Sequence, residues 1–106
     1  MSYVKNLEIG ELNGLYGGIL TERQREFLRL YYDCDMSLFE ISDLFGVSRQ
    51  AVRDAIVRGE KELLRIEEAL GFLSKRKSIG EKLDELKSAD NESFAERLKE
   101  IEELLY

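Results

Sequence analysis

The chain has 106 residues, of which 43% are hydrophobic and 36% are charged. This composition is typical of one small folded domain and argues against wholesale disorder. The sequence has no proline, which favours helices, and no histidine, which removes the commonest general base and metal ligand. The single cysteine, Cys34, excludes an intrachain disulfide and a paired-thiolate metal site. We therefore expect a protein that is not an enzyme and that carries no metal or other cofactor.

No stretch approaches the roughly 20 apolar residues that a membrane helix needs. The first twenty residues contain Glu8 and Glu11 and lack the basic start and apolar run of a signal peptide. The sequence therefore predicts a cytoplasmic protein with no membrane insertion.

The net charge of −6 is distributed unevenly along the chain. Residues 20–65 contain eight basic and nine acidic residues, whereas residues 66–106 contain seven basic and eleven acidic residues. A basic surface can therefore still form on the N-terminal part, although the overall charge argues against tight, nonspecific binding to nucleic acid.

The first segment, residues 3–20, spaces its apolar residues as a helix does, but four glycines weaken it. We expect a helix that depends on docking and that ends near Gly17-Gly18. No Lys-Ser/Thr pair follows these glycines, so they do not form a phosphate-binding loop.

Two capping signatures follow, in which a Ser or Thr precedes a Gln or Glu by three residues. Residues 21–24 (TERQ) open a helix that is predicted to stop around Cys34-Asp35. Residues 37–40 (SLFE) open a short helix whose inward residues are predicted to be Leu38, Ile41, Leu44 and Phe45. Gly46 then supplies a residue that can adopt the left-handed conformation after a helix.

Ser48 is predicted to cap a long helix from Arg49 to about Phe72. One stripe of that helix, at alternating spacings of four and three, consists of Val52, Ile56, Gly59, Leu63, Ile66, Leu70 and Leu73. Such a stripe is either core contact or a seam with another long helix. Gly59 is predicted to be a point of close approach or bending.

The basic cluster Lys75-Arg76-Lys77 is predicted to be a solvated linker. Two more capping signatures, at residues 78–81 (SIGE) and 93–96 (SFAE), predict two C-terminal helices. The second of these helices carries a stripe formed by Phe94, Leu98, Ile101 and Leu105. We expect six helices and no strand, with a helix-turn-helix domain over residues 1–74. We expect residues 75–106 to form a helical extension that packs on this domain or on a partner subunit.

The segment from 37 to 56 has the layout of a helix-turn-helix, in which the second helix enters the DNA major groove. Ile41 and Phe45 would hold the first helix, and Val52 with Ala55 or Ile56 would pack the second. Arg can read guanine and Gln can read adenine, while a Ser at a helix N-terminus can hold a phosphate. The predicted nucleic-acid-binding residues are Ser48, Arg49, Gln50, Arg53, Asp54, Arg58 and Lys61, with Val57 beside them.

Residues 15–63 resemble the YlxM-type family of helix-turn-helix proteins (UPF0122), which is similar to region 4 of bacterial sigma factors. The matching motifs are Leu20-Thr21 with Arg23-Gln24, the run Leu30-Tyr31-Tyr32, and residues 46–52 (GVSRQAV). The resemblance implies an all-α, sigma region 4-like bundle with a long recognition helix and two further C-terminal helices. It also implies a DNA-binding regulatory role associated with the signal recognition particle pathway. Two positions depart from the family, which usually has Tyr at Arg53 and a residue other than glycine at Gly59.

Two functions remain open on the sequence. One is a regulator that binds DNA or signal recognition particle RNA; the other is an adaptor for the signal recognition particle's protein component or RNA, with the helix-turn-helix as scaffold. Catalysis is disfavoured because the pairs Glu67-Glu68 and Glu102-Glu103 are adjacent in sequence and point about 100° apart on a helix. Asp33 and Asp35 flank Cys34 and disfavour a reactive thiolate.

The apolar stripes also predict a homodimer, because one short chain does not readily cover both. The alternative is that the last two helices fold back on the long helix within one chain. The predicted dimer interface consists of Leu63, Ile66, Leu70, Leu73, Leu98, Ile101 and Leu105.

Overall fold

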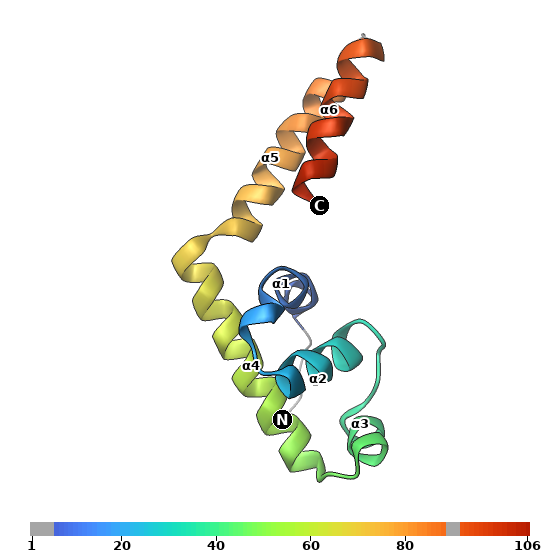
Figure 1. Cartoon of the computed structure of the whole chain (residues 1–106), viewed down its shortest axis with the longest axis vertical. Coiled ribbons are helices and arrows are strands. Elements are labelled where there is room, and N and C mark those ends of the chain that lie inside the picture. The colour runs from blue at the N-terminus through green and yellow to red at the C-terminus, as the bar shows by residue number, and fades with distance from the viewer. Residues whose placement is uncertain (1–5, 89–91) are drawn as a thin grey trace. The chain divides into compact units, whose positions relative to one another are not determined.

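The structure, a computed structural model, describes residues 6–88 and 92–106, and within these ranges it contains helices and no strand (Figure 1). The start of the predicted N-terminal helix, residues 3–5, lies outside the described residues. The chain divides into two compact units, residues 1–70 and 71–106. The domain boundary expected from the sequence, after Ser74, lies inside a helix of the second unit.

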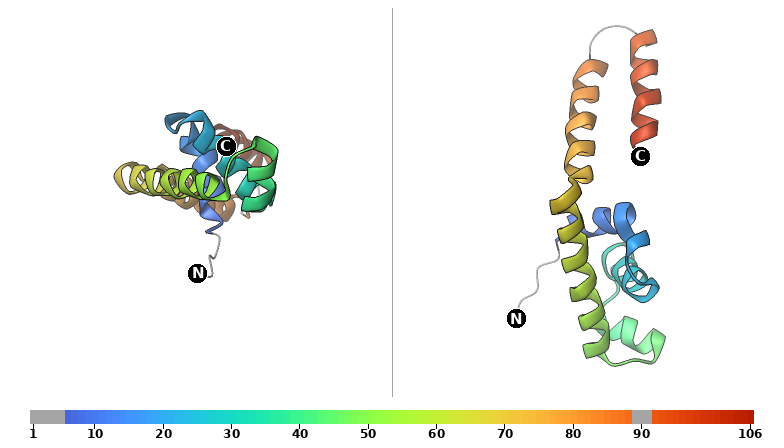
Figure 2. Two further views of the ribbon diagram at one scale, coloured as in Figure 1. Left: turned by 90° about the horizontal axis from the view of Figure 1, so that it is seen from below. Right: turned by 60° about the vertical axis from the view of Figure 1, so that its left-hand side comes forward.

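The first unit contains α1 (Glu8–Tyr16), the short 3-10 helix η1 (Gly17–Ile19), α2 (Glu22–Tyr32), α3 (Leu38–Phe45) and α4 (Arg49–Leu70). Helices α1, α2 and α3 all pack against α4, which Figure 2 shows as the long helix along one side of this unit. The buried side chains come from every helix of the unit. Those that are at most 2% exposed are Ile9, Leu12, Phe27, Leu28, Ile41, Val52, Ile56 and Leu63. Burial of these side chains stabilises the unit, because helices as short as α1, α2 and α3 are marginally stable in isolation.

The first two capping predictions are confirmed. The Thr21 hydroxyl accepts a hydrogen bond from the backbone of Gln24, whose side chain accepts one from the backbone of Thr21. Ser37 and Glu40 make the same reciprocal pair at the start of α3. Each pair satisfies two backbone donors that a helix start would otherwise leave without partners.

Helix α4 ends at Leu70, before the expected end at Phe72, because Gly71 adopts a left-handed backbone with φ of 65°. The next helix, α5 (Phe72–Lys87), begins at once. The prediction of a solvated linker at Lys75-Arg76-Lys77 is therefore wrong, since these residues lie in the first turns of α5.

The two later capping signatures, at residues 78–81 and 93–96, do not mark the starts of helices. Ser78 lies inside α5 and does not begin a helix. Helix α6 (Glu92–Leu105) begins one residue before Ser93, whose side chain is outside the described residues. A Ser-x-x-Glu spacing also occurs by chance in a helix rich in glutamate, so the spacing alone does not locate a helix start.

Gly59 is a point of close approach, as the sequence predicts. A Cβ added there would lie 2.7 Å from Cδ1 of Leu28 and 3.5 Å from Cβ of Gln24. Glycine therefore lets α2 approach α4 more closely than any side chain would permit. Tyr32 and Tyr16 add hydrogen bonds to α4, donating to Glu60 at 2.5 Å and to Glu67 at 2.8 Å.

Candidate nucleic-acid interface

The turn between α3 and α4 has the conformation expected for a helix-turn-helix. Gly46 ends α3 in the left-handed conformation with φ of 65°, and its N–H donates to the carbonyl of Ser42. The N–H of Val47 donates to the same carbonyl at 3.1 Å. Ser48 then caps α4, because its hydroxyl accepts from the N–H of Ala51 at 3.0 Å. The turn is thus fixed by backbone bonds, which sets the direction in which α4 leaves it.

The inner face of α4 is buried as predicted, since Val52 is 0% exposed and Ile56 is 2% exposed. From α3, Ile41 is fully buried. The prediction for the rest of α3 is partly wrong, because Leu44 is 63% exposed and Phe45 is 40% exposed. Helix α3 packs on α2 and α4. Phe45 lies at the helix end and meets Phe27 edge to face at 5.0 Å.

The outer face of α4 carries the predicted binding residues. Gln50, Asp54 and Lys61 are spaced along one line of the helix, opposite Val52 and Ile56, and Arg53 lies beside this line. The predicted binding residues Ser48, Arg49, Gln50, Arg53, Asp54, Arg58 and Lys61 are all exposed. Their exposure matches the expectation, and their role in binding stays a prediction.

Arg49 is held against the first helix of the pair. Its guanidinium lies 4.8 Å from the centre of the Phe39 ring, a cation–π contact between α4 and α3. Phe39 was not among the predicted site residues, and it is 55% exposed. An exposed aromatic residue at the second position of the first helix is the signal that could have identified it.

Gln50 and Asp54 interact one helical turn apart. The Gln50 amide donates to the Asp54 carboxylate at 2.9 Å, which is the usual geometry for residues at i and i+4. The bond fixes the orientation of the amide, so its carbonyl oxygen and second N–H stay available for another partner.

From Ser48 to Lys61 the chain carries four basic residues and two acidic residues. Arg53, Arg58 and Lys61 make no hydrogen bond or ion pair with any residue that the structure describes. Glu60, by contrast, accepts a hydrogen bond from Tyr32 of α2 and is half-buried, so it points away from the outer face. The segment from Ser48 to Lys61 therefore has a formal charge of +2 in a chain whose net charge is −6.

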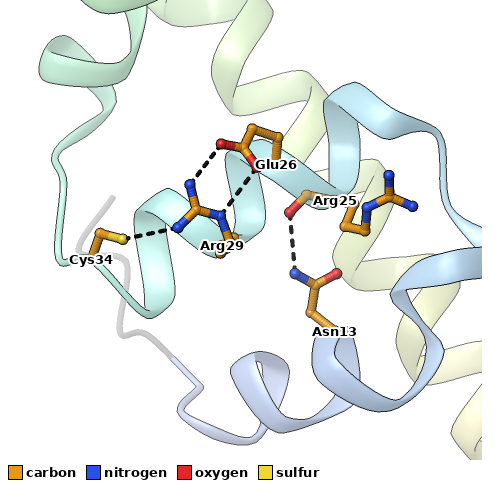
Figure 3. Close-up of polar contacts among 5 residues, drawn as sticks. All are labelled: Asn13, Arg25, Glu26, Arg29 and Cys34. Carbon is orange, nitrogen blue, oxygen red and sulfur yellow. Dashed lines mark hydrogen bonds and ion pairs between the residues drawn. The ribbon is translucent and has the colours of Figure 1, made fainter.

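Cys34 lies in a different polar cluster, shown in Figure 3. It is exposed, and Arg29 donates to its sulfur at 3.4 Å. Glu26 holds the same guanidinium through two hydrogen bonds, at 2.7 and 3.1 Å. These bonds raise the pKa of Arg29 and lower that of Glu26. Asn13 donates to the carbonyl of Arg25 at 3.1 Å and joins α1 to α2.

The part of the chain that the structure describes has no group of three or more potential metal-ligating His, Cys, Asp or Glu side chains. None of its helices combines the length and apolarity needed to cross a bilayer.

The residues predicted for a dimer interface fall into two groups. Leu63, Ile66, Leu73 and Leu98 are at most 5% exposed in the single chain, whereas Leu70 and Ile101 are 43% and 47% exposed and Leu105 is half-buried. In the first unit, α1 and α2 pack on the face of α4 that carries Leu63 and Ile66. The first group is therefore not an uncovered stripe, and the homodimer itself stays a prediction.

Comparison with known proteins identifies the family. The profile described as "Putative helix-turn-helix protein, YlxM / p13 like" matches residues 3–103. The chain belongs to the UPF0122 family. This UPF0122 match extends beyond residues 15–63 and includes α5 and most of α6.

Several UPF0122 proteins are similar to this chain over most of its length. The one from Halalkalibacterium halodurans is 43% identical over 102 residues, covering 95% of this chain and 94% of that protein. The one from Thermoanaerobacter sp. (strain X514) is 42% identical over 98 residues, covering 88% and 84%. A UPF0122 protein from Desulforamulus reducens is 50% identical over 68 residues, covering 64% of this chain and 58% of that protein.

Substitutions at the adjacent residues Val52 and Arg53 of this UPF0122 protein test which face of α4 is buried. Val52→Ala should lower the free energy of unfolding by ~1–3 kcal/mol, because Val52 is fully buried. Arg53→Ala should change it by less than about 0.5 kcal/mol, because Arg53 is exposed. Urea unfolding followed by circular dichroism measures both, and equal effects would mean that α4 faces the core differently.

Proposed function

We propose that this protein binds nucleic acid, with double-stranded DNA as the first candidate, through the outer face of the N-terminal half of α4. The observation that supports this most directly is the capped α3–turn–α4 unit, which leaves Gln50, Arg53 and Lys61 exposed on one helix. A helix presented in this way has the dimensions and direction to enter a major groove.

Each side chain has a chemical role in this proposal. Arg53 reads guanine through N7 and O6, and Gln50, whose amide Asp54 holds, reads adenine. Arg58 and Lys61 contact phosphates farther along the backbone. Arg49, held on Phe39, contacts a phosphate near the start of α4 together with Ser48.

We also propose that the chain acts as a homodimeric regulator in the cytoplasm. A two-fold dimer presents two α4 helices to a two-fold site, which raises both affinity and specificity. The family resemblance supports an association with the signal recognition particle pathway, with that particle's RNA as the second nucleic-acid candidate.

The second candidate function is an adaptor that binds the protein component of the signal recognition particle. The observation that favours it is the exposure of three large apolar side chains on α3, Phe39, Leu44 and Phe45, which are 40–63% exposed. Exposed apolar side chains can serve as contacts between proteins. The net charge of −6 also fits this role better than DNA binding.

Selection from a random duplex library, followed by gel shifts on the enriched duplex, separates the two candidates. We expect enrichment of a defined duplex that binds at least ~10³-fold more tightly than a scrambled one. Gel shifts with signal recognition particle RNA test the second nucleic-acid candidate in parallel. No binding to either nucleic acid at low salt, together with binding to the purified particle protein, would support the adaptor and contradict nucleic-acid binding.

A further inference from the structure

The guanidinium of Arg49 is held by a ring, whereas two other arginines of the first unit are held by carboxylates. Arg29 and Arg65 each donate to a glutamate three residues earlier, at 2.7 and 2.5 Å. Such a carboxylate occupies N–H donors and compensates the charge. The Arg49 guanidinium lies 4.8 Å from the centre of the Phe39 ring, and its side chain makes no hydrogen bond or ion pair within the described ranges. Its N–H donors therefore have no acceptor from the described chain.

The two acidic residues of α3 do not compensate Arg49 either. Glu40 accepts a hydrogen bond from the backbone of Ser37, in the capping pair that begins α3. Asp43 is exposed and lies four residues after Phe39, but it makes no ion pair with Arg49. The contact with the ring thus leaves the charge of Arg49 available to an anion.

The place of Phe39 is fixed by local hydrogen bonds. Phe39 is the second residue of α3, directly after the start that Ser37 and Glu40 define. The Ser42 hydroxyl donates to the carbonyl of Phe39 at 2.8 Å. The Phe39 side chain nevertheless stays 55% exposed. The ring can therefore hold a guanidinium at the surface of the first unit, where a ligand has access to it.

The contact joins the two helices of the helix-turn-helix. Phe39 belongs to α3, and Arg49 is the first residue of α4. A free arginine side chain loses conformational entropy when binding holds it in one rotamer. Because the ring restricts Arg49 before a ligand binds, less entropy is lost when the guanidinium contacts a phosphate.

We infer that Phe39 is a positioning residue for nucleic-acid binding and that it acts by holding the Arg49 guanidinium where a phosphate is bound. The ring fixes the cation without compensating its charge. The inference rests on the proposed function and adds a residue of α3 to a binding surface otherwise formed by Ser48 and α4. It also gives the exposed Phe39 a role other than contact with a partner protein.

A double-mutant cycle on the full chain tests the inference, with affinity for the selected duplex measured by fluorescence anisotropy. Phe39→Ala should weaken binding ~2- to 5-fold, the range expected for an exposed cation–π contact. In an Arg49→Ala background the same substitution should have almost no effect, because the cation on which Phe39 acts is gone. Equal losses in the two backgrounds would overturn the inference and leave nucleic-acid binding in place.

Two further substitutions separate the aromatic ring from apolar bulk. Phe39→Leu keeps a large apolar side chain but has no π-system, so it should weaken binding as much as Phe39→Ala. Phe39→Tyr keeps the ring and should bind as the wild type does. Wild-type affinity for Phe39→Leu would show that Phe39 acts through packing alone, which contradicts the inference.

Leu44→Ala is the matched control on the same helix. Leu44 is 63% exposed and lies about 140° around α3 from Phe39, so its loss should leave affinity for the duplex unchanged. A loss equal to that of Phe39→Ala would assign the effect to exposed apolar side chains of α3 in general and overturn the inference. A wild-type chain that binds no duplex would overturn the proposed function itself, and this inference with it.

Discussion

Phe27→Ala should be among the most destabilising single substitutions in the first unit, lowering the free energy of unfolding by ~3–5 kcal/mol. Phe27 is 1% exposed, meets Phe45 edge to face at 5.0 Å, and has the Arg23 guanidinium 5.5 Å from its ring centre. Its removal leaves a cavity between α2 and α3, and the first helix of the helix-turn-helix loses its support. Urea unfolding followed by circular dichroism measures the effect.

Phe39→Ala is the matched control, because it removes the same atoms from α3 at a site that is 55% exposed. It should cost less than about 1 kcal/mol, since only the stacking with Arg49 is lost. If the two substitutions cost the same, Phe27 does not occupy the core as described.

Arg53→Ala should weaken binding to the selected duplex ~5- to 150-fold, which corresponds to ~1–3 kcal/mol for one bidentate base contact. Arg53 is exposed and makes no hydrogen bond or ion pair with the described residues, so it is available for a base edge. Fluorescence anisotropy on the selected duplex and on single-base variants would show whether specificity relaxes at one position.

Arg65→Ala provides the control on the same helix. Arg65 is well exposed and is held by Glu62 at 2.5 Å, which raises the pKa of the guanidinium. Its charge is thus largely compensated, and the substitution should change affinity less than about twofold. Equal losses for Arg53→Ala and Arg65→Ala would indicate general electrostatic attraction without base readout.

The helix-turn-helix could be predicted from sequence because its signals are local. Thr21 and Ser37 begin helices through contacts three residues away, and Gly46 ends one through its own φ. The rotation of α4 follows from the period of its apolar residues, so that Val52 is buried and Arg53, about 100° away, is exposed. Such signals need no knowledge of the rest of the fold.

The errors come from features that depend on tertiary packing. Leu44 and Phe45 have the spacing of core residues, but the packing of α3 leaves them 63% and 40% exposed. The contact of Arg49 with Phe39 depends on the angle between α3 and α4, which cannot be predicted from local sequence signals. In the second unit, Ser78 and Glu81 have the spacing of a capping pair but lie within α5. The helix begins after Gly71, whose backbone is left-handed.

The salt dependence of binding to the selected duplex tests the central claim most directly. Arg49, Arg53, Arg58 and Lys61 offer three to four charged contacts per chain, so the logarithm of the association constant should fall against the logarithm of salt concentration with a slope of about −3 per bound chain. Lys61→Ala should make that slope shallower by about 1, because Lys61 is assigned to a phosphate. A slope near zero, with affinity unchanged between about 50 and 200 mM salt, would contradict nucleic-acid binding through α4.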